Sequence, residues 1–70
     1  MIKKYLKSLG KNIRNTRKSK GISQERLAEL IGKSRNYIGM VERSEINTPT
    51  ETIMEIAVAL NVHPKTFFEF

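Results

Sequence analysis

The stretch from Ser23 to Arg43 constrains the fold of this chain more than any other part, because a short helical pattern stands on each side of one glycine. Apolar residues recur in both halves at the spacing of a helix with one buried face. They are Leu27, Ala28 and Ile31 in the first half, and Ile38 and Val41 in the second. Ser23 is expected to cap the first helix, Gly32 to end it and Ser34 to open the second. Two short helices joined by a glycine-containing turn make a helix-turn-helix.

The outward face of the second helix carries side chains that suit the bases of DNA. These residues are Arg35, Asn36, Gly39, Met40 and Arg43. In the major groove, arginine pairs with the guanine edge and asparagine with the adenine edge, and both residue types stand here in the first turn. We therefore predict that Arg35 and Asn36 read bases and that Met40 contacts a thymine methyl. An ordinary exposed polar face is the alternative. Gly39 is explained equally by close approach to DNA and by packing.

The basic residues gather at the start of the chain. The net charge is +6, and eight of the 13 basic residues, but none of the seven acidic ones, lie in residues 1–20. This asymmetry favours a polyanionic partner, with nucleic acid ahead of an anionic membrane and of simple solubility. Residues 1–8 are expected to form a basic N-terminal extension, either an arm or an extra helical turn.

Helical spacing recurs outside the central stretch and predicts an all-α chain of five helices. The first helix runs from near the N-terminus to about Lys18, although Gly10 weakens it. The fourth follows Pro49, and the fifth runs from Pro64 to about Glu69. The apolar positions are Ile2, Leu6, Leu9 and Ile13 in the first helix, and Ile53, Ile56, Ala57 and Leu60 in the fourth.

Three phenylalanines crowd the end of the chain: Phe67, Phe68 and Phe70. A chain this short buries three such rings with difficulty, and exposed aromatic clusters mark interfaces. We predict a homodimer through these residues. The alternative is a monomer with Phe67 and Phe68 inside and Phe70 frayed.

Composition argues against an enzyme and against a membrane protein. The chain of 70 residues has one histidine and no cysteine, and it lacks a glycine-rich phosphate loop or metal-ligand spacing. Its longest apolar run, Ile56 to Leu60, is far shorter than the roughly 20 residues of a membrane span. We expect a single domain over residues 1–70 in the cytoplasm, with no metal, cofactor, small-molecule ligand or membrane partner.

The segment GISQERLAELIGKSRNYIGMVER resembles the DNA-binding domain of the Cro/CI-type, or XRE, helix-turn-helix family. The likeness extends from about Leu9 to Phe68. It implies a five-helix, phage-repressor-like domain that binds double-stranded DNA. It also implies that Arg17 pairs with Glu42, and a partly buried pair would fix the recognition helix to the first helix. Two ordinary surface charges are the alternative. Ser44 departs from the family, which has glycine there, and this disfavours a left-handed cap.

The resemblance further implies contacts with the phosphate backbone from the start of the second helix and from the loop after the third. The residues expected to hold phosphates are Gln24, Ser34, Tyr37, Arg43, Asn47 and Thr48, with some N-terminal lysines. For Tyr37, packing inward remains an alternative.

The predicted function is that of a sequence-specific DNA-binding transcriptional regulator, a homodimer on a palindromic operator. The Arg35-x-Tyr37-Ile38 run, the length and the phenylalanine-rich end resemble restriction–modification controller proteins. Phage repressors and antitoxins share the same domain. The alternative is an antitoxin or protein-interaction module that binds a toxin partner through residues 67–70. RNA is less favoured, because its duplex closes the major groove to side chains.

Overall fold

The protein consists of four α-helices and one short 3₁₀ helix, without strands, in a computed structural model that describes residues 1–70. The elements are α1 (Ile2–Ser19), α2 (Gln24–Ile31), α3 (Arg35–Glu42), α4 (Thr50–Leu60) and the 3₁₀ helix η1 (Pro64–Phe68). The prediction of an all-α fold is confirmed. None of the helices combines the length and the apolar character that crossing a membrane requires.

The segment expected to be the fifth helix is the 3₁₀ helix η1, so the structure has four α-helices and the predicted count of five helices is not confirmed. His63 caps this segment, since its Nδ1 accepts a hydrogen bond of 3.0 Å from the backbone N–H of Lys65. The N–H of Thr66 then bonds to the carbonyl of His63, three residues back. Only five residues adopt this winding, and so short a segment favours the tighter i to i+3 pattern.

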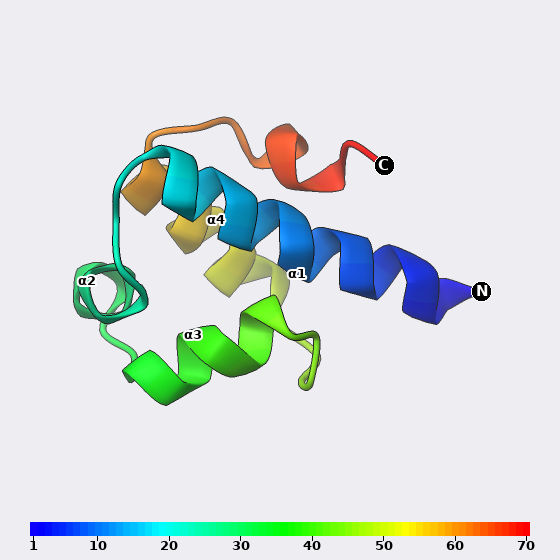
Figure 1. The fold of residues 1–70 in the computed structure, drawn as a ribbon, viewed down its shortest axis with the longest axis horizontal. Helices are drawn as coiled ribbons and strands as arrows, with labels where there is room; N and C mark the ends of the chain where they lie inside the picture. The colour runs from blue at the N-terminus through cyan, green and yellow to red at the C-terminus, as the bar shows by residue number, and fades with distance from the viewer.

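The long helix α1 is the element on which the others are arranged (Figure 1). Helix α3 packs against one side of α1 and η1 against the other. Helix α2 is seen end-on beside the C-terminal end of α1. The first turns of α1 extend past the other elements. Helix α1 begins at Ile2, so residues 1–8 continue the helix and do not form a separate arm.

The apolar stripes predicted from the sequence meet in one core. Ten apolar side chains are buried there: Ile13, Leu27, Ala28, Ile38, Val41, Ile53, Ile56, Ala57, Leu60 and Phe67. Phe67 is fully buried, and Asn12 holds the end of the chain over α1 by donating to the carbonyls of Phe67 and Glu69, both at 3.1 Å. Phe67 therefore belongs to the core, and its assignment to a dimer interface is wrong.

The ends of α2 and the start of α3 are set by local hydrogen bonds, as the sequence indicated. The hydroxyl of Ser23 accepts a bond of 3.0 Å from the N–H of Arg26, and that of Ser34 accepts one of 3.0 Å from the N–H of Tyr37. Gly32 ends α2 in the left-handed conformation, with φ 69°. These caps confirm the predicted helix-turn-helix boundaries.

Gly10 lies where α1 meets the C-terminal end of α3. A Cβ atom at this position would stand 2.5 Å from the carbonyl oxygen of Glu42 and 2.8 Å from that of Val41. Backbone atoms cannot yield as a flexible side chain does, so only glycine allows this approach. The sequence suggested a weak point in the helix. The structure shows a point of close contact between two helices.

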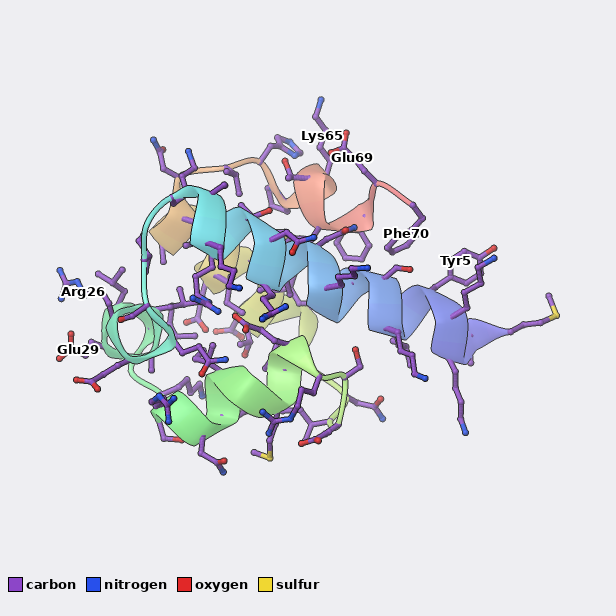
Figure 2. The ribbon with its side chains drawn as sticks, in the orientation of Figure 1. Tyr5, Arg26, Glu29, Lys65, Glu69 and Phe70 are labelled. Carbon is purple, nitrogen blue, oxygen red and sulfur yellow. The ribbon has the colours of Figure 1, made fainter.

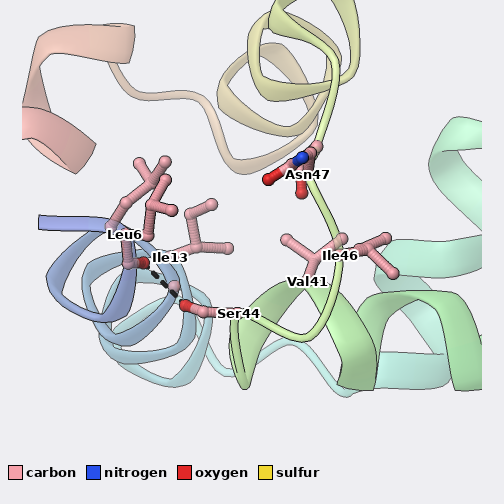
Figure 3. Close-up of a pocket in the computed structure, with 9 residues that line it drawn as sticks. Leu6, Ile13, Val41, Ser44, Ile46 and Asn47 are labelled. Atoms are coloured by element: carbon pink, nitrogen blue, oxygen red, sulfur yellow. Dashed lines mark hydrogen bonds between the residues drawn. The ribbon is translucent and has the colours of Figure 1, made fainter. Parts of the chain in front are cut away.

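The turn after α3 is left-handed although it lacks the family's glycine. Ser44 has φ 57°, its N–H bonds to the carbonyl of Val41, and the N–H of Glu45 bonds to that of Met40. A left-handed non-glycine residue costs on the order of 1 kcal/mol. A hydrogen bond of 2.6 Å from the Ser44 hydroxyl to the carbonyl of Leu6 helps to offset this cost (Figure 3). The bond ties the turn to α1 beside a small hollow of about 100 Å³.

Candidate nucleic-acid interface

Helix α3 presents its predicted base readers on the side away from the core. Arg35 and Asn36 are exposed and Met40 is partly buried, whereas Ile38 and Val41 are buried on the opposite side. The N-cap at Ser34 starts the helix immediately before Arg35, so both polar readers stand in its first turn. They can therefore reach a ligand without any change in the packing of the helix.

A buried ion pair fixes α3 to α1. Arg17 Nε lies 2.7 Å from Glu42 Oε2 and Arg17 Nη2 lies 3.1 Å from Glu42 Oε1. The two side chains are only 8% and 1% exposed. Arg17 also donates to the carbonyl of Ile22, at 2.8 Å, which adds the loop between α1 and α2 to the network. No buried side-chain polar atom in the structure lacks a partner, so both charges are fully compensated.

Gln24 joins this network, which sequence reasoning did not anticipate. Its Nε2 donates to Glu42 Oε1 at a distance of 3.0 Å. A carboxamide nitrogen carries two hydrogens, so one N–H remains for a phosphate at the start of α2. Glu42 thus orients the side chain predicted to contact phosphate. The available signal was weak: a glutamine beside the N-cap indicates a surface contact but not an inward partner.

Basic side chains of α1 line shallow hollows that lead to α3. Lys11, Arg14, Gln24, Glu42 and Arg43 surround one hollow. A second one shares Arg14 and Gln24 with the first and reaches Arg35, and a third shares Lys11 and is lined by Lys3, Lys4, Lys7 and Ser8. The hollows form a mainly basic track, called the basic track below, from the start of α1 to the start of α3, and its lining includes two acidic residues, Glu25 and Glu42. Sequence reasoning saw the excess of charge but did not single out Lys11 or Arg14.

Arg43 makes an ion pair with Glu45 on the surface. Arg43 Nε lies 3.0 Å from Glu45 Oε2 and Nη2 lies 3.1 Å from Oε1, and the side chains are 57% and 51% exposed. The hydrogen bond with Arg43 lowers the pKa of the Glu45 carboxyl, and the same bond raises the pKa of Arg43. Arg43 was predicted to hold a phosphate. The ion pair of its guanidinium with Glu45 was not predicted from the sequence.

The remaining predicted phosphate contacts lie in different surroundings. Asn47 is exposed in the loop after α3, and Thr48 is partly buried beside it. Both line the small hollow between this loop and α1 (Figure 3). Tyr37 packs partly against the core, and Lys33 Nζ lies 5.5 Å from the centre of its ring. Inward packing, the alternative stated for Tyr37, is thus at least partly realised.

Two phenylalanines at the end of the chain remain on the surface. Phe68 is 48% exposed and Phe70 is 59% exposed. The ring centres of Phe70 and Tyr5 are 5.5 Å apart, and those of Phe68 and Phe70 are 6.3 Å apart. Figure 2 shows Tyr5 and Phe70 side by side near the start of α1. Tyr5, Phe68 and Phe70 are called the aromatic surface below.

No group of three or more histidine, cysteine, aspartate or glutamate side chains is arranged to hold a metal ion. Near α3, Arg17 is paired with Glu42 and Arg43 with Glu45, whereas Arg35 makes no ion pair. What the site offers chemically is a set of exposed donors, a guanidinium and a carboxamide above all, on a rigid helix.

Comparison with known proteins gives consistent matches. A model of the helix-turn-helix family matches residues 13–67. Control protein C.SmaI of Serratia marcescens is 47% identical over 53 residues, which cover 76% of this chain and 63% of that protein. Control protein C.BamHI of Bacillus amyloliquefaciens is 39% identical over 62 residues, which cover 87% of this chain and 76% of that protein. The chain thus spans less than two thirds of the Serratia protein.

A solved structure is similar over nearly its whole length. The restriction-modification controller protein C.AhdI from Aeromonas hydrophila superimposes with a TM-score of 0.86 at 41% sequence identity. The match covers 90% of this chain and 91% of that one.

Proposed function

Because the chain belongs to the helix-turn-helix family of DNA-binding regulators, we propose that it controls transcription as a homodimer on a palindromic operator, in the manner of a restriction–modification controller. The observation that carries this proposal is the exposure of Arg35 and Asn36 at the start of a helix that a buried ion pair holds in place. We expect the protein to work in the cytoplasm, without a cofactor or a small-molecule ligand.

Sequence reading is assigned to α3. Arg35 and Asn36 would pair with guanine and adenine edges in the major groove, and Met40 would touch a thymine methyl. The partial burial of Met40 suits an apolar contact at the edge of the interface. Double-stranded DNA is the expected ligand, because a helix fits its major groove and does not fit that of duplex RNA.

The phosphate backbone would be held on both sides of α3. The start of α2 offers backbone N–H groups and the second amide hydrogen of Gln24. The remaining contacts are assigned to Ser34, Tyr37, Arg43, Asn47 and Thr48, with the lysines of the basic track. This track supports the assignment, because counterion release from DNA gives sequence-independent affinity to such surfaces.

The aromatic surface is the proposed dimer contact, with Phe68 and Phe70 at its centre and Phe67 excluded. Exposed rings in contact with each other favour association over solvation. A two-fold dimer would place the two copies of α3 in successive major grooves, about 34 Å apart. Sedimentation of a Phe68→Ser, Phe70→Ser variant should show monomers under conditions in which the unaltered protein is a dimer.

Selection of bound sites from random duplex DNA tests the whole proposal. The expected product is a pair of inverted half-sites with centres about 10 base pairs apart. Arg35→Ala should relax the preference at one base pair of each half-site, while binding at low salt persists. Recovery of no preferred sequence, or an unchanged preference in the Arg35 variant, would contradict the assignment of α3 as the reader.

A second candidate function is favoured by the exposure of Phe68 and Phe70. The same aromatic surface suits a protein partner, such as a toxin that this chain would mask. Under that alternative the purified chain binds DNA weakly and copurifies with the partner. The serine variants described above would then lose the partner but keep the sedimentation behaviour of the unaltered chain.

A further inference from the structure

On the outer face of α3, the guanidinium of Arg43 lies over Gly39, in the space that a side chain at this position would fill. This place is called the seat at Gly39 below. Arg35, Gly39 and Arg43 are spaced by four residues and therefore follow one line along the helix. A Cβ atom at Gly39 would lie 3.0 Å from Arg43 Nη1. Gly39 is buried although its neighbours on this face are exposed or partly exposed, because the arginine covers it. Arg43 thus lies back along the helix toward Arg35.

Glu45 fixes the guanidinium in this seat. The left-handed turn at Ser44 brings Glu45 beside Arg43, and the carboxylate accepts from Nε at 3.0 Å and from Nη2 at 3.1 Å. Two parallel N–H···O bonds restrict a planar guanidinium far more than a single contact does. The pair stands on the same side of the molecule as the hollow lined by Arg14 and Gln24, where DNA is proposed to bind.

We propose that Glu45 is a specificity-determining residue, which positions Arg43 over Gly39 and competes with DNA for its guanidinium. The inference rests on the proposed function. Glu45 occupies the Nε and Nη2 side of the guanidinium, one of the forks with which arginine binds two acceptors on a guanine edge or on a phosphate. DNA that binds this side of Arg43 must therefore replace the carboxylate. Only a duplex that offers two well-placed acceptors recovers both bonds, so Glu45 weakens binding to unrelated sequences more than binding to the operator.

The competing explanation is that Glu45 repels DNA as any surface carboxylate would. Glu55 provides a control for the loss of one negative charge elsewhere on the surface, because it is an exposed glutamate on α4 that makes no ion pair. A second control removes Arg43 itself. General repulsion persists without Arg43, whereas competition for its guanidinium disappears.

The test measures the dissociation constants of the unaltered protein, Glu45→Gln, Arg43→Gln, the double variant and Glu55→Gln. Each is titrated with a selected operator and with an unrelated duplex of equal length, at several salt concentrations. Glu45→Gln should tighten binding to the unrelated duplex about fivefold to tenfold and to the operator about twofold, which lowers the specificity ratio. Glu55→Gln should change both by less than about twofold.

The effect of Glu45→Gln should shrink to that of Glu55→Gln when Arg43 is already glutamine. Equal effects of the two glutamate variants, or a full effect of Glu45→Gln without Arg43, would overturn the inference. The titrations with the two duplexes also distinguish the two kinds of contact that Arg43 can make. A base contact is possible only with the operator, whereas a phosphate contact is possible with both duplexes.

A measurement without DNA keeps this inference separate from the proposed function. The carboxyl of Glu45 should titrate below its ordinary pKa in the unaltered protein and return toward it in Arg43→Gln, as followed by NMR. If no variant binds any duplex, the proposed function fails although the pair exists. If DNA is bound but this titration is the same in both proteins, Glu45 does not hold Arg43 and the inference fails alone.

Discussion

Two consecutive residues, Glu42 and Arg43, end α3 and make two ion pairs of opposite character. Glu42 faces inward to Arg17, and its side chain is 1% exposed. Arg43 faces outward to Glu45, and its side chain is 57% exposed. Both pairs have two hydrogen bonds of similar length. The comparison teaches that burial, rather than bond geometry, decides whether a charge pair holds a helix in place or remains available to a ligand.

The physical reason lies in the solvent. Around Arg43 and Glu45, water screens the charges and solvates each of them when the pair opens. The side chains of Arg17 and Glu42 are largely removed from water, so removal of one charge leaves the other buried and uncompensated. The inner pair is therefore structural, and the outer pair can exchange its partner.

The largest expected effect comes from breaking the inner pair. Glu42→Ala should lower the free energy of unfolding by about 3–5 kcal/mol, because it strands the guanidinium of Arg17 and also frees Gln24. Urea denaturation followed by circular dichroism measures this change. The control is Glu45→Ala, which should leave the midpoint almost unchanged. Similar midpoints for the two variants would contradict the contrast drawn here.

The inner side of α3 can also be tested at its contact with α1. Gly10→Ala places a methyl group against the carbonyl oxygens of Glu42 and Val41, and this should destabilise the protein by about 1–3 kcal/mol. The better helix propensity of alanine acts in the opposite direction. Lys11→Ala, at the next and exposed position, is the control and should change stability by less than about 0.5 kcal/mol. A stabilised Gly10 variant would show that the two helices can separate at little cost.

On the outer side, a substitution should affect binding and not folding. Arg35→Ala should cost about 1–3 kcal/mol of operator binding and relax selectivity at one base pair, as measured by titration with operator variants. Its thermal midpoint should stay close to that of the unaltered protein, because the side chain is exposed. Loss of folding in this variant would show that Arg35 stabilises the fold, and would contradict its assignment as a base reader.

The smallest expected effect is the contribution of the outer pair to stability. The lowered pKa of Glu45 means that this contribution is present at neutral pH, above the ordinary carboxyl pKa, and is lost as the pH falls through the lowered value. A double-mutant cycle on Arg43 and Glu45 should show weak coupling that vanishes near 1 M salt, where the screening length is about 3 Å. The Arg17–Glu42 cycle, run under the same conditions, should keep most of its coupling.

Much of the helical framework could be predicted because it depends on neighbours in the chain. Ser23 and Ser34 each cap a helix by bonding to an N–H group three residues later in the chain. Gly32 ends α2 through its own left-handed conformation. The extent of η1 could not be predicted in this way. The sequence PKTFF suits either winding, whereas the packing of η1 against α1 and the burial of Phe67 involve residues that are distant in sequence.

The residue assignments at the candidate site also depended on whether the interaction was local in sequence. The outward position of Arg35 and Asn36 follows from helical periodicity and agrees with the structure. The inward bond of Gln24 to Glu42, the seat at Gly39 and the burial of Phe67 depend on groups that are distant in sequence or on a turn of unusual conformation. No local pattern encodes them.

By itself, the sequence determined the α-helices, the turn between α2 and α3 and the face of α3 that points outward, because each of these follows from interactions within a few residues. Only the tertiary structure decided which charges lose their water and which phenylalanine fills the core. Arg17 meets Glu42 across 25 positions, and Asn12 meets the carbonyl of Phe67 across 55. Burial is a property of the assembled helices, and it decides whether a charged or aromatic side chain stabilises the fold or remains exposed to a ligand.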